Sequence, residues 1–244
     1  MKLKLICCEV FMRMAFYRAA ISPNMIDIDF IPVRAHEDAD ELRKTITEKI
    51  AATEAGPVDY DAIILGYGLC GNSLSGIAAI GTQLVIPRAH DCCAIFLGSR
   101  LKFKEHFGDK LSATWSSHGY MERCGDYLRE TDTGKMLGLD KGYAELVEKY
   151  GEENAAYIWE TVHPAFHDNE VIFIRIPEID KLGFSERFME SAEADGKELT
   201  WLEGDMSLIR KLLDGDWNAD EFLIVKPGQK ITPTYDLISV FEAE

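Results

Sequence analysis

Five of the six cysteines in this sequence fall in three short segments that also carry histidine, glycine and acidic residues. The segments are ICCE (residues 6–9), GYGLCGN (residues 66–72) and PRAHDCC (residues 87–93). Cysteine thiolates and imidazole nitrogens are the ligands that zinc and other thiophilic metals prefer. These residue types therefore favour metal binding or thiolate chemistry.

The spacing within each segment selects the candidate ligands. Side chains alternate between the two faces of a strand, so Cys7 and Cys8 point in opposite directions, and Cys8 is nearer to the end of the strand. His90 and Cys92 are two positions apart and can face one ion. We predict a metal site made by Cys8, Cys70, His90 and Cys92. Zinc is the expected metal, with an iron–sulfur cluster or another transition metal as alternatives.

Further polar and glycine residues near these cysteines are expected to contribute to the site. Two carboxylates flank the cysteines and would orient ligands, and an arginine would meet an anion. The predicted cofactor-binding residues are Gly68, Gly71, Asn72, Glu9, Asp91, Arg88 and Tyr120. Each has a structural alternative: the glycines as a tight turn with positive φ, the charged residues as surface groups or ion pairs, and the tyrosine as part of a polar loop.

The cysteines also have other interpretations. There is no CxxC pair, and a reduced cysteine is often packed in a core as a small hydrophobic residue. A redox or nucleophilic thiol is a third alternative. The segment GYGLCG has neither the spacing of a dinucleotide-binding loop nor a following GKS or GKT, so a nucleotide loop is not predicted. The pattern assigns no catalytic residue.

The elements that would position these segments alternate between strand and helix patterns. Apolar strand patterns cover residues 2–10, 25–33, 60–68 and 82–88. Helix patterns separate them at 11–20 and 36–55, and another helix is expected over 91–107; Leu42, Ile46 and Ile50 share one face of the second. This order predicts an α/β fold with a parallel sheet and helices on both faces. The three cysteine segments then follow strands at the carboxyl edge, where ligands bind in such sheets.

The C-terminal third repeats the pattern. Strands are expected at 170–177, 197–204 and 221–228, and helices at 185–194 and 205–214, with Asp205 as the N-cap of the second. A mostly helical segment, 121–166, separates the two halves. One α/β domain over 1–244 or two Rossmann-like lobes, 1–120 and 167–244, fit this order equally well.

Composition and charge narrow the classes of partner. The 244 residues carry a net charge of −16, which disfavours nucleic acid and anionic lipid as partners. No apolar run approaches the roughly 20 residues of a membrane helix, and the N-terminal segment does not resemble a signal peptide. We therefore expect a cytoplasmic protein with mostly reduced cysteines. The oligomeric state is left open.

Five segments together resemble the family catalogued as domain of unknown function 1638. They are LICCEVF, GYGLCGN, PRAHDCCAIFLGS, YGEENA and EGDMSLIRKLLDGDWNADEFLIVKPG. The resemblance implies that the motif cysteines are Cys8, Cys70 and Cys92, and that the motif histidine is His90. Cys7 and Cys93 look like additional cysteines. Where the family usually has Gly-Trp, this chain has Gly119-Tyr120.

The resemblance also implies a setting in anaerobes, beside corrinoid proteins and their methyltransferases. The first hypothesis is a metal-binding catalytic or accessory component of corrinoid-dependent methyl transfer of methylated amines or related C1 substrates. Its partners would be a small-molecule C1 substrate, a corrinoid protein or a methyltransferase, and a zinc-dependent methyltransferase-type activity is one alternative within it. The second is a non-enzymatic binding module for a corrinoid, a methylated amine or a partner methyltransferase, with a cleft lined by Tyr67, Trp115 and Tyr120. The third is an iron–sulfur protein that uses the same cysteines.

Overall fold

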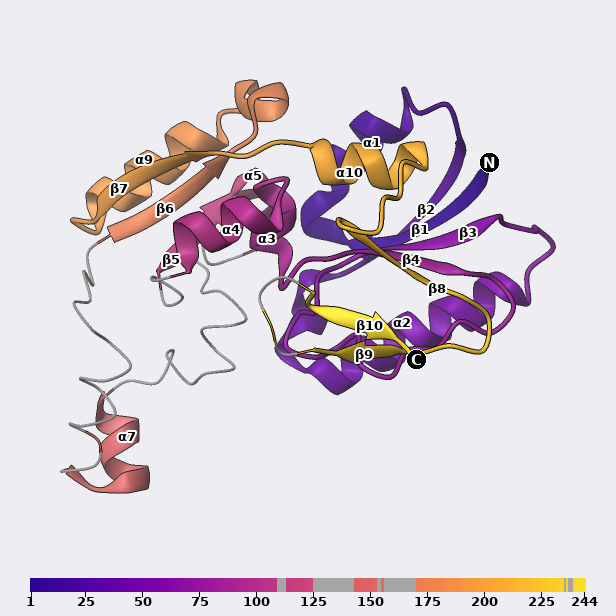
Figure 1. Cartoon of the computed structure of the whole chain (residues 1–244). Helices are drawn as coiled ribbons and strands as arrows, with labels where there is room; N and C mark the ends of the chain where they lie inside the picture. The colour runs from indigo at the N-terminus through magenta and orange to yellow at the C-terminus, as the bar shows by residue number, and fades with distance from the viewer. Residues whose placement is uncertain (109–112, 125–142, 153–154, 156–169, 235, 237–238) are drawn as a thin grey trace.

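The computed structural model describes residues 1–108, 113–124, 143–152, 155, 170–234, 236 and 239–244. In this part the chain forms a five-stranded sheet, a three-stranded sheet and a two-stranded sheet, with helices packed around them (Figure 1). The α/β class, with parallel strands and helices on both faces, is confirmed. Most of the predicted helical segment 121–166 lies outside the described residues.

The first sheet has the strand order β2-β1-β3-β4-β8. The first four strands are parallel and β8 is antiparallel to β4. Every residue of β3 is buried, as the continuous apolar run predicts for a central strand. The bounds are β1 Lys2–Cys8, β2 Met25–Ile31, β3 Ala62–Gly66, β4 Leu84–Pro87 and β8 Phe222–Val225.

Helices cover both faces of this sheet. In Figure 1, α1 and α10 lie on one face and α2 on the other. Leu42, Ile46 and Ile50 are buried in α2, which confirms the predicted apolar face. The bounds are η1 Glu9–Phe11, α1 Met12–Ala19, η2 Val33–Glu37, α2 Ala39–Glu54 and α10 Ser207–Asp214.

Two helix boundaries differ from the sequence prediction. The helix expected over 91–107 is divided into α3 (Cys92–Phe96) and α4 (Arg100–Phe107). Gly98 has φ +73° between them, a conformation that ends a helix. The predicted N-cap of α10 was wrong by one residue: Met206 occupies the cap, and the carboxylate of Asp205 accepts a hydrogen bond from the first backbone N–H of the helix.

The second sheet has the order β5-β6-β7, with all three strands parallel. Phe188 of α9 packs on Phe173 of β6, with ring centroids 4.8 Å apart. A small antiparallel pair, β9 and β10, lies near the C-terminus (Figure 1). The bounds are β5 Thr114–Ser117, α5 His118–Arg123, α7 Tyr143–Tyr150, β6 Glu170–Arg175, η3 Pro177–Leu182, α9 Phe184–Ala194, β7 Glu198–Glu203, β9 Ile231–Pro233 and β10 Phe241–Ala243.

The chain leaves the first sheet and later returns to it. After α4 it builds the second sheet, and then α10 packs beside α1 and β8 joins the edge of the first sheet. The segment 167–244 therefore contributes strands to both sheets, and β5, within 1–120, belongs to the second sheet.

The contact between η1 and α5 joins the carboxyl ends of the two sheets. η1 follows β1 directly, α5 follows β5 directly, and the two pack against each other. A Cβ atom at Gly119 would lie only 1.8 Å from the carbonyl oxygen of Val10. Glycine therefore allows a backbone approach that no other residue permits. Arg13 and Glu122 form an ion pair at 2.7 Å beside this contact.

We expect Gly119→Ala to destabilise the protein by about 3 kcal/mol, because the added methyl group must push η1 and α5 apart. Chemical denaturation followed by circular dichroism measures the change. Gly81→Ala is the matched control, since the nearest atom to its Cβ is a side-chain oxygen of Glu54 at 3.7 Å. Equal stability of the two variants would contradict the proposed close contact.

Candidate functional site

The cysteine segments meet at the carboxyl edge of the first sheet. From β1 the chain moves outward to β2 on one side, and then crosses to β3 on the other side. The carboxyl ends of β1 and β3 therefore form a topological switch point, where doubly wound sheets bind ligands. Cys8 ends β1, and the loop of Cys70 follows β3.

The loops that follow β3 and β4 are joined by their backbones. Leu69 N–H donates to Ala89 O at 2.9 Å, and Cys70 N–H donates to His90 O at 2.8 Å. A Cβ atom at Gly68 would lie 2.6 Å from the backbone nitrogen of Asp91. Gly68 therefore serves a close approach between two loops, which brings the Cys70 loop beside the start of α3.

Three successive residues of the first loop are left-handed. Cys70, Gly71 and Asn72 have φ values of +46°, +63° and +69°. Gly71 fits the tight turn that the sequence indicates. For Cys70 and Asn72 this conformation costs about 1 kcal/mol each, because the Cβ crowds the following carbonyl. Such conformations in residues other than glycine are typical of functional sites.

Four thiols lie near enough to Tyr67 to influence the pKa of its hydroxyl. We call these five residues the thiol cluster: Tyr67, Cys7, Cys8, Cys70 and Cys92. Burial raises the pKa of the Tyr67 hydroxyl well above its usual value, and the four neighbouring thiols raise this pKa further. Within the described part of the chain, the buried Tyr67 hydroxyl has no hydrogen-bond partner. The cluster therefore holds a buried polar atom that no described residue satisfies.

Burial also governs the thiols. The pKa of Cys8 is raised well above its ordinary value, first by burial and then by Cys92. Burial and the charge of Asp29 raise the pKa of Cys7. Both thiols are therefore protonated at neutral pH. All six cysteines are described, and none of them forms a disulfide.

The second sheet contributes a tyrosine to this cluster. Cys92 Sγ and the Tyr120 hydroxyl are 2.7 Å apart, within hydrogen-bond distance. Tyr120 packs edge-on against Trp115, with ring centroids 5.1 Å apart. Both rings are buried. The three aromatic residues of the second hypothesis thus lie at the cluster, but as parts of a closed core.

His90 makes its ring contacts elsewhere. The ring stacks on Phe103 with centroids 6.1 Å apart. Burial lowers the pKa of His90, and a hydrogen bond with the backbone of Asp236 partly opposes this shift. Its Nε2 atom is buried, and no described residue forms a hydrogen bond with it. In the described part of the chain, no three His, Cys, Asp or Glu side chains are grouped so that they could hold a metal ion. The Cys8–Cys70–His90–Cys92 site stays a prediction.

The two carboxylates predicted to support the site, Glu9 and Asp91, have structural contacts. Glu9 Oε1 accepts the Val33 N–H at 2.8 Å and so holds the start of η2. Asp91 caps α3 by accepting the Cys93 N–H at 3.0 Å. Both contacts give the carboxylates a structural role in holding the backbone. Their predicted role in orienting metal ligands stays a prediction.

Asn72 and Arg88 also make hydrogen bonds that involve backbone carbonyl groups. The carbonyl of Asn72 accepts a hydrogen bond from Arg43 at 2.8 Å. Arg88 donates to the carbonyl oxygens of Ala219 at 3.0 Å and Ser239 at 2.6 Å. Arg88 therefore links the C-terminal segment to the end of β4. No contact that the structure describes joins Arg88 to Asp91.

The polar loop expected around Tyr120 is instead the helix α5. His118 begins this helix and is 1% exposed. Its Nε2 lies 3.2 Å from Asp180 Oδ1, and its Nδ1 accepts the Ile176 N–H at 3.4 Å. The neutral tautomer that carries its proton on Nε2 satisfies both contacts. Sequence reasoning missed this link because Asp180 and Ile176 are about 60 positions away in the sequence.

The match to a family model decides the identity of the chain. The model of the family DUF1638, described as proteins of unknown function, matches residues 30–213. The chain belongs to this family. No curated protein and no solved structure matches it.

A further property of this DUF1638 protein concerns its helices and the requirements of a membrane span. Among the described residues, none of the helices has the length and apolar character that a bilayer crossing requires.

Acid is expected to weaken the fold through His118. Burial lowers the pKa of His118, so the stability that it contributes is present above its ordinary pKa of about 6.5 and is lost as the pH falls below that value. We expect the free energy of unfolding to decrease between pH 7 and pH 5 in the wild type, and to decrease less in His118→Gln. Urea denaturation at several pH values measures both slopes. Identical slopes would contradict this role of His118.

The thiols of the native DUF1638 protein should differ sharply in reactivity. Cys124 is partly exposed, whereas the other five cysteines are buried. We expect one fast-reacting thiol with Ellman's reagent at pH 8, and the remaining five only after denaturation. Cys124→Ser should remove the fast phase. Two or more fast-reacting thiols in the wild type would show that the cluster is open to solvent.

Proposed function

We propose that this DUF1638 protein binds a thiophilic metal ion through Cys8, Cys70 and Cys92, and acts as a catalytic or accessory component of corrinoid-dependent methyl transfer. The observation that carries the proposal is the buried Tyr67 hydroxyl, which has no hydrogen-bond partner among the described residues and whose pKa is raised by burial and by four nearby thiols. A buried polar atom of this kind costs free energy unless a ligand or a water molecule satisfies it.

The electrostatics of the cluster favour a cation as that ligand. Cys92 raises the pKa of Cys8, and the thiols together raise the pKa of Tyr67. These groups therefore oppose one another's ionisation, and burial adds to this effect. A bound cation would instead lower the pKa of the thiols, because it stabilises thiolates directly.

Zinc is the first choice of metal because thiolates with one further ligand match its usual coordination. When bound, zinc keeps thiol ligands and thiol substrates as thiolates at neutral pH. The described thiols do not form a ready-made three-ligand group, so ion uptake requires them to move closer together. His90 would join them only if its ring left Phe103. The family resemblance supports methyl transfer as the setting.

A second candidate function is a binding module for a methylated amine or a corrinoid. The observation that favours it is a set of three buried polar atoms on β5 that lack hydrogen-bond partners among the described residues: Trp115 Nε1, Ser116 Oγ and Ser117 Oγ. Trp115 also packs against Tyr120. Calorimetry with glycine betaine and with a cobamide tests this candidate, and binding without any metal would favour it over the first.

Metal analysis after anaerobic purification tests the first candidate. We expect close to one zinc ion per chain in the wild type, either as purified or after zinc addition, and at least a tenfold lower zinc affinity in Cys70→Ser. Cys124→Ser is the matched control, because Cys124 is not part of the thiol cluster, and it should bind zinc as the wild type does. Visible absorbance of the same sample identifies an iron–sulfur cluster.

Absence of stoichiometric metal, with no uptake of zinc, iron, nickel or cobalt, would contradict the proposal. Unchanged affinity in Cys70→Ser would remove Cys70 from the site.

A further inference from the structure

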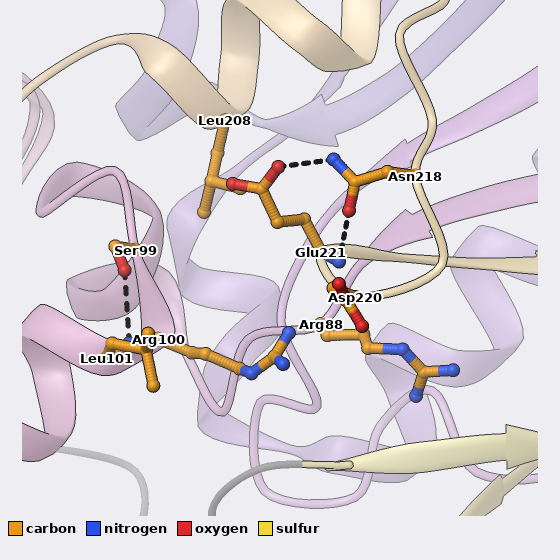
Figure 2. A pocket seen from close by; sticks show the side chains of 8 residues that line it. All are labelled: Arg88, Ser99, Arg100, Leu101, Leu208, Asn218, Asp220 and Glu221. Atoms are coloured by element: carbon orange, nitrogen blue, oxygen red, sulfur yellow. Dashed lines mark hydrogen bonds between the residues drawn. The ribbon is translucent and has the colours of Figure 1, made fainter.

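A groove of about 340 Å³ lies at the carboxyl end of β4 and is separate from the thiol cluster. Figure 2 shows its walls: Arg88 after β4, the start of α4 with Arg100, Leu208 of α10, and the segment that leads into β8. None of the thiol-cluster residues lines it. The carboxyl edge of a doubly wound sheet is where ligands bind, so the position favours a binding function.

The Arg100 guanidinium lies in this groove without a direct partner among the described residues. No described residue forms an ion pair or a hydrogen bond with its guanidinium, and its Nε atom is buried without a partner. Figure 2 shows the Arg100 side chain extending along the groove toward Arg88. A buried guanidinium nitrogen without an acceptor is unusual, because desolvated charges are nearly always paired.

The acidic residues of the groove are engaged with other cations. Glu221 forms an ion pair with Lys211 and a hydrogen bond with Asn218. Asp220 lies near Arg88 and raises its pKa, as Asp236 and Glu242 also do. Burial raises the pKa of Glu221, and its contacts with Lys211 and Asn218, together with the charge of Arg100, lower this pKa overall. Arg100 itself forms no ion pair with a carboxylate in the described part of the chain.

Arg88 and Arg100 repel each other in this groove. Burial lowers the pKa of Arg88, and the charge of Arg100 lowers it further. Arg88 cannot move away, because it is tied to the carbonyl oxygens of Ala219, Ser239 and Phe241. An anion between the two guanidinium groups would relieve this repulsion and supply the acceptor that Arg100 lacks.

We propose that this groove binds a small molecule through an oxyanion group, a phosphate or a carboxylate, and that Arg100 is the residue that recognises it. The planar guanidinium matches the two oxygen atoms of either group. The volume suits a small ligand and not a macromolecule. This inference does not depend on the thiol cluster.

Calorimetric titration tests the proposal with two probes, inorganic phosphate and malonate, at a constant ionic strength set with chloride. We expect saturable binding of at least one probe to the wild type. The probe that binds with the higher affinity shows whether the groove prefers a phosphate or a carboxylate. Arg100→Met should weaken binding at least tenfold, because a charge-assisted hydrogen bond contributes about 1.5–3 kcal/mol. Arg100→Lys keeps the charge but loses the two-oxygen geometry and should also weaken binding.

Lys226→Met is the matched control, since it removes one positive charge at the far end of β8, at the opposite edge of the sheet. It should bind as the wild type does. Circular dichroism checks the fold of each variant, and Arg100→Lys decides the outcome if Arg100→Met does not fold. Absence of saturable binding of both probes to the wild type, or an equal loss in Lys226→Met, would overturn the proposal.

Discussion

The thiol cluster depends on the pair of backbone hydrogen bonds between the loops that follow β3 and β4. They require Gly68 to approach Asp91 more closely than any side chain permits. This contact fixes Cys70 in its left-handed conformation beside the start of α3, where Cys92 lies. Cys8 reaches the same place because β1 is the neighbour of β3. Strand order brings the three thiols to one edge of the sheet, and this loop contact fixes the position of the Cys70 loop there.

The second sheet closes this arrangement from the other side. The packing of α5 on η1 brings Tyr120 to Cys92, so the two sheets meet at their carboxyl ends with the thiol cluster on their boundary. The Arg88–Arg100 groove lies at the same edge of the first sheet, but farther along, between β4 and β8. The protein therefore presents two chemically different places at one edge: a buried one rich in sulfur and an open one rich in guanidinium groups.

The sequence predicts the strands and helices of the first sheet well, because their apolar periodicity is strong and local. It also predicts that the cysteine segments share one edge, since this follows from strand order alone. It could not predict the direction of the His90 ring, which depends on contacts with Phe103 and Asp236. The addition of β8 to the first sheet likewise depends on long-range packing, and the segment reads equally well as part of a separate lobe.

The central claim is that the thiols of the cluster bind one metal ion together. X-ray absorption spectroscopy of the zinc-loaded protein at the zinc edge tests this claim most directly. We expect sulfur atoms at about 2.3 Å from zinc, with about three of them in the wild type and fewer in a Cys8→Ser variant. A first shell of only nitrogen and oxygen atoms, or a spectrum unchanged by that substitution, would contradict it.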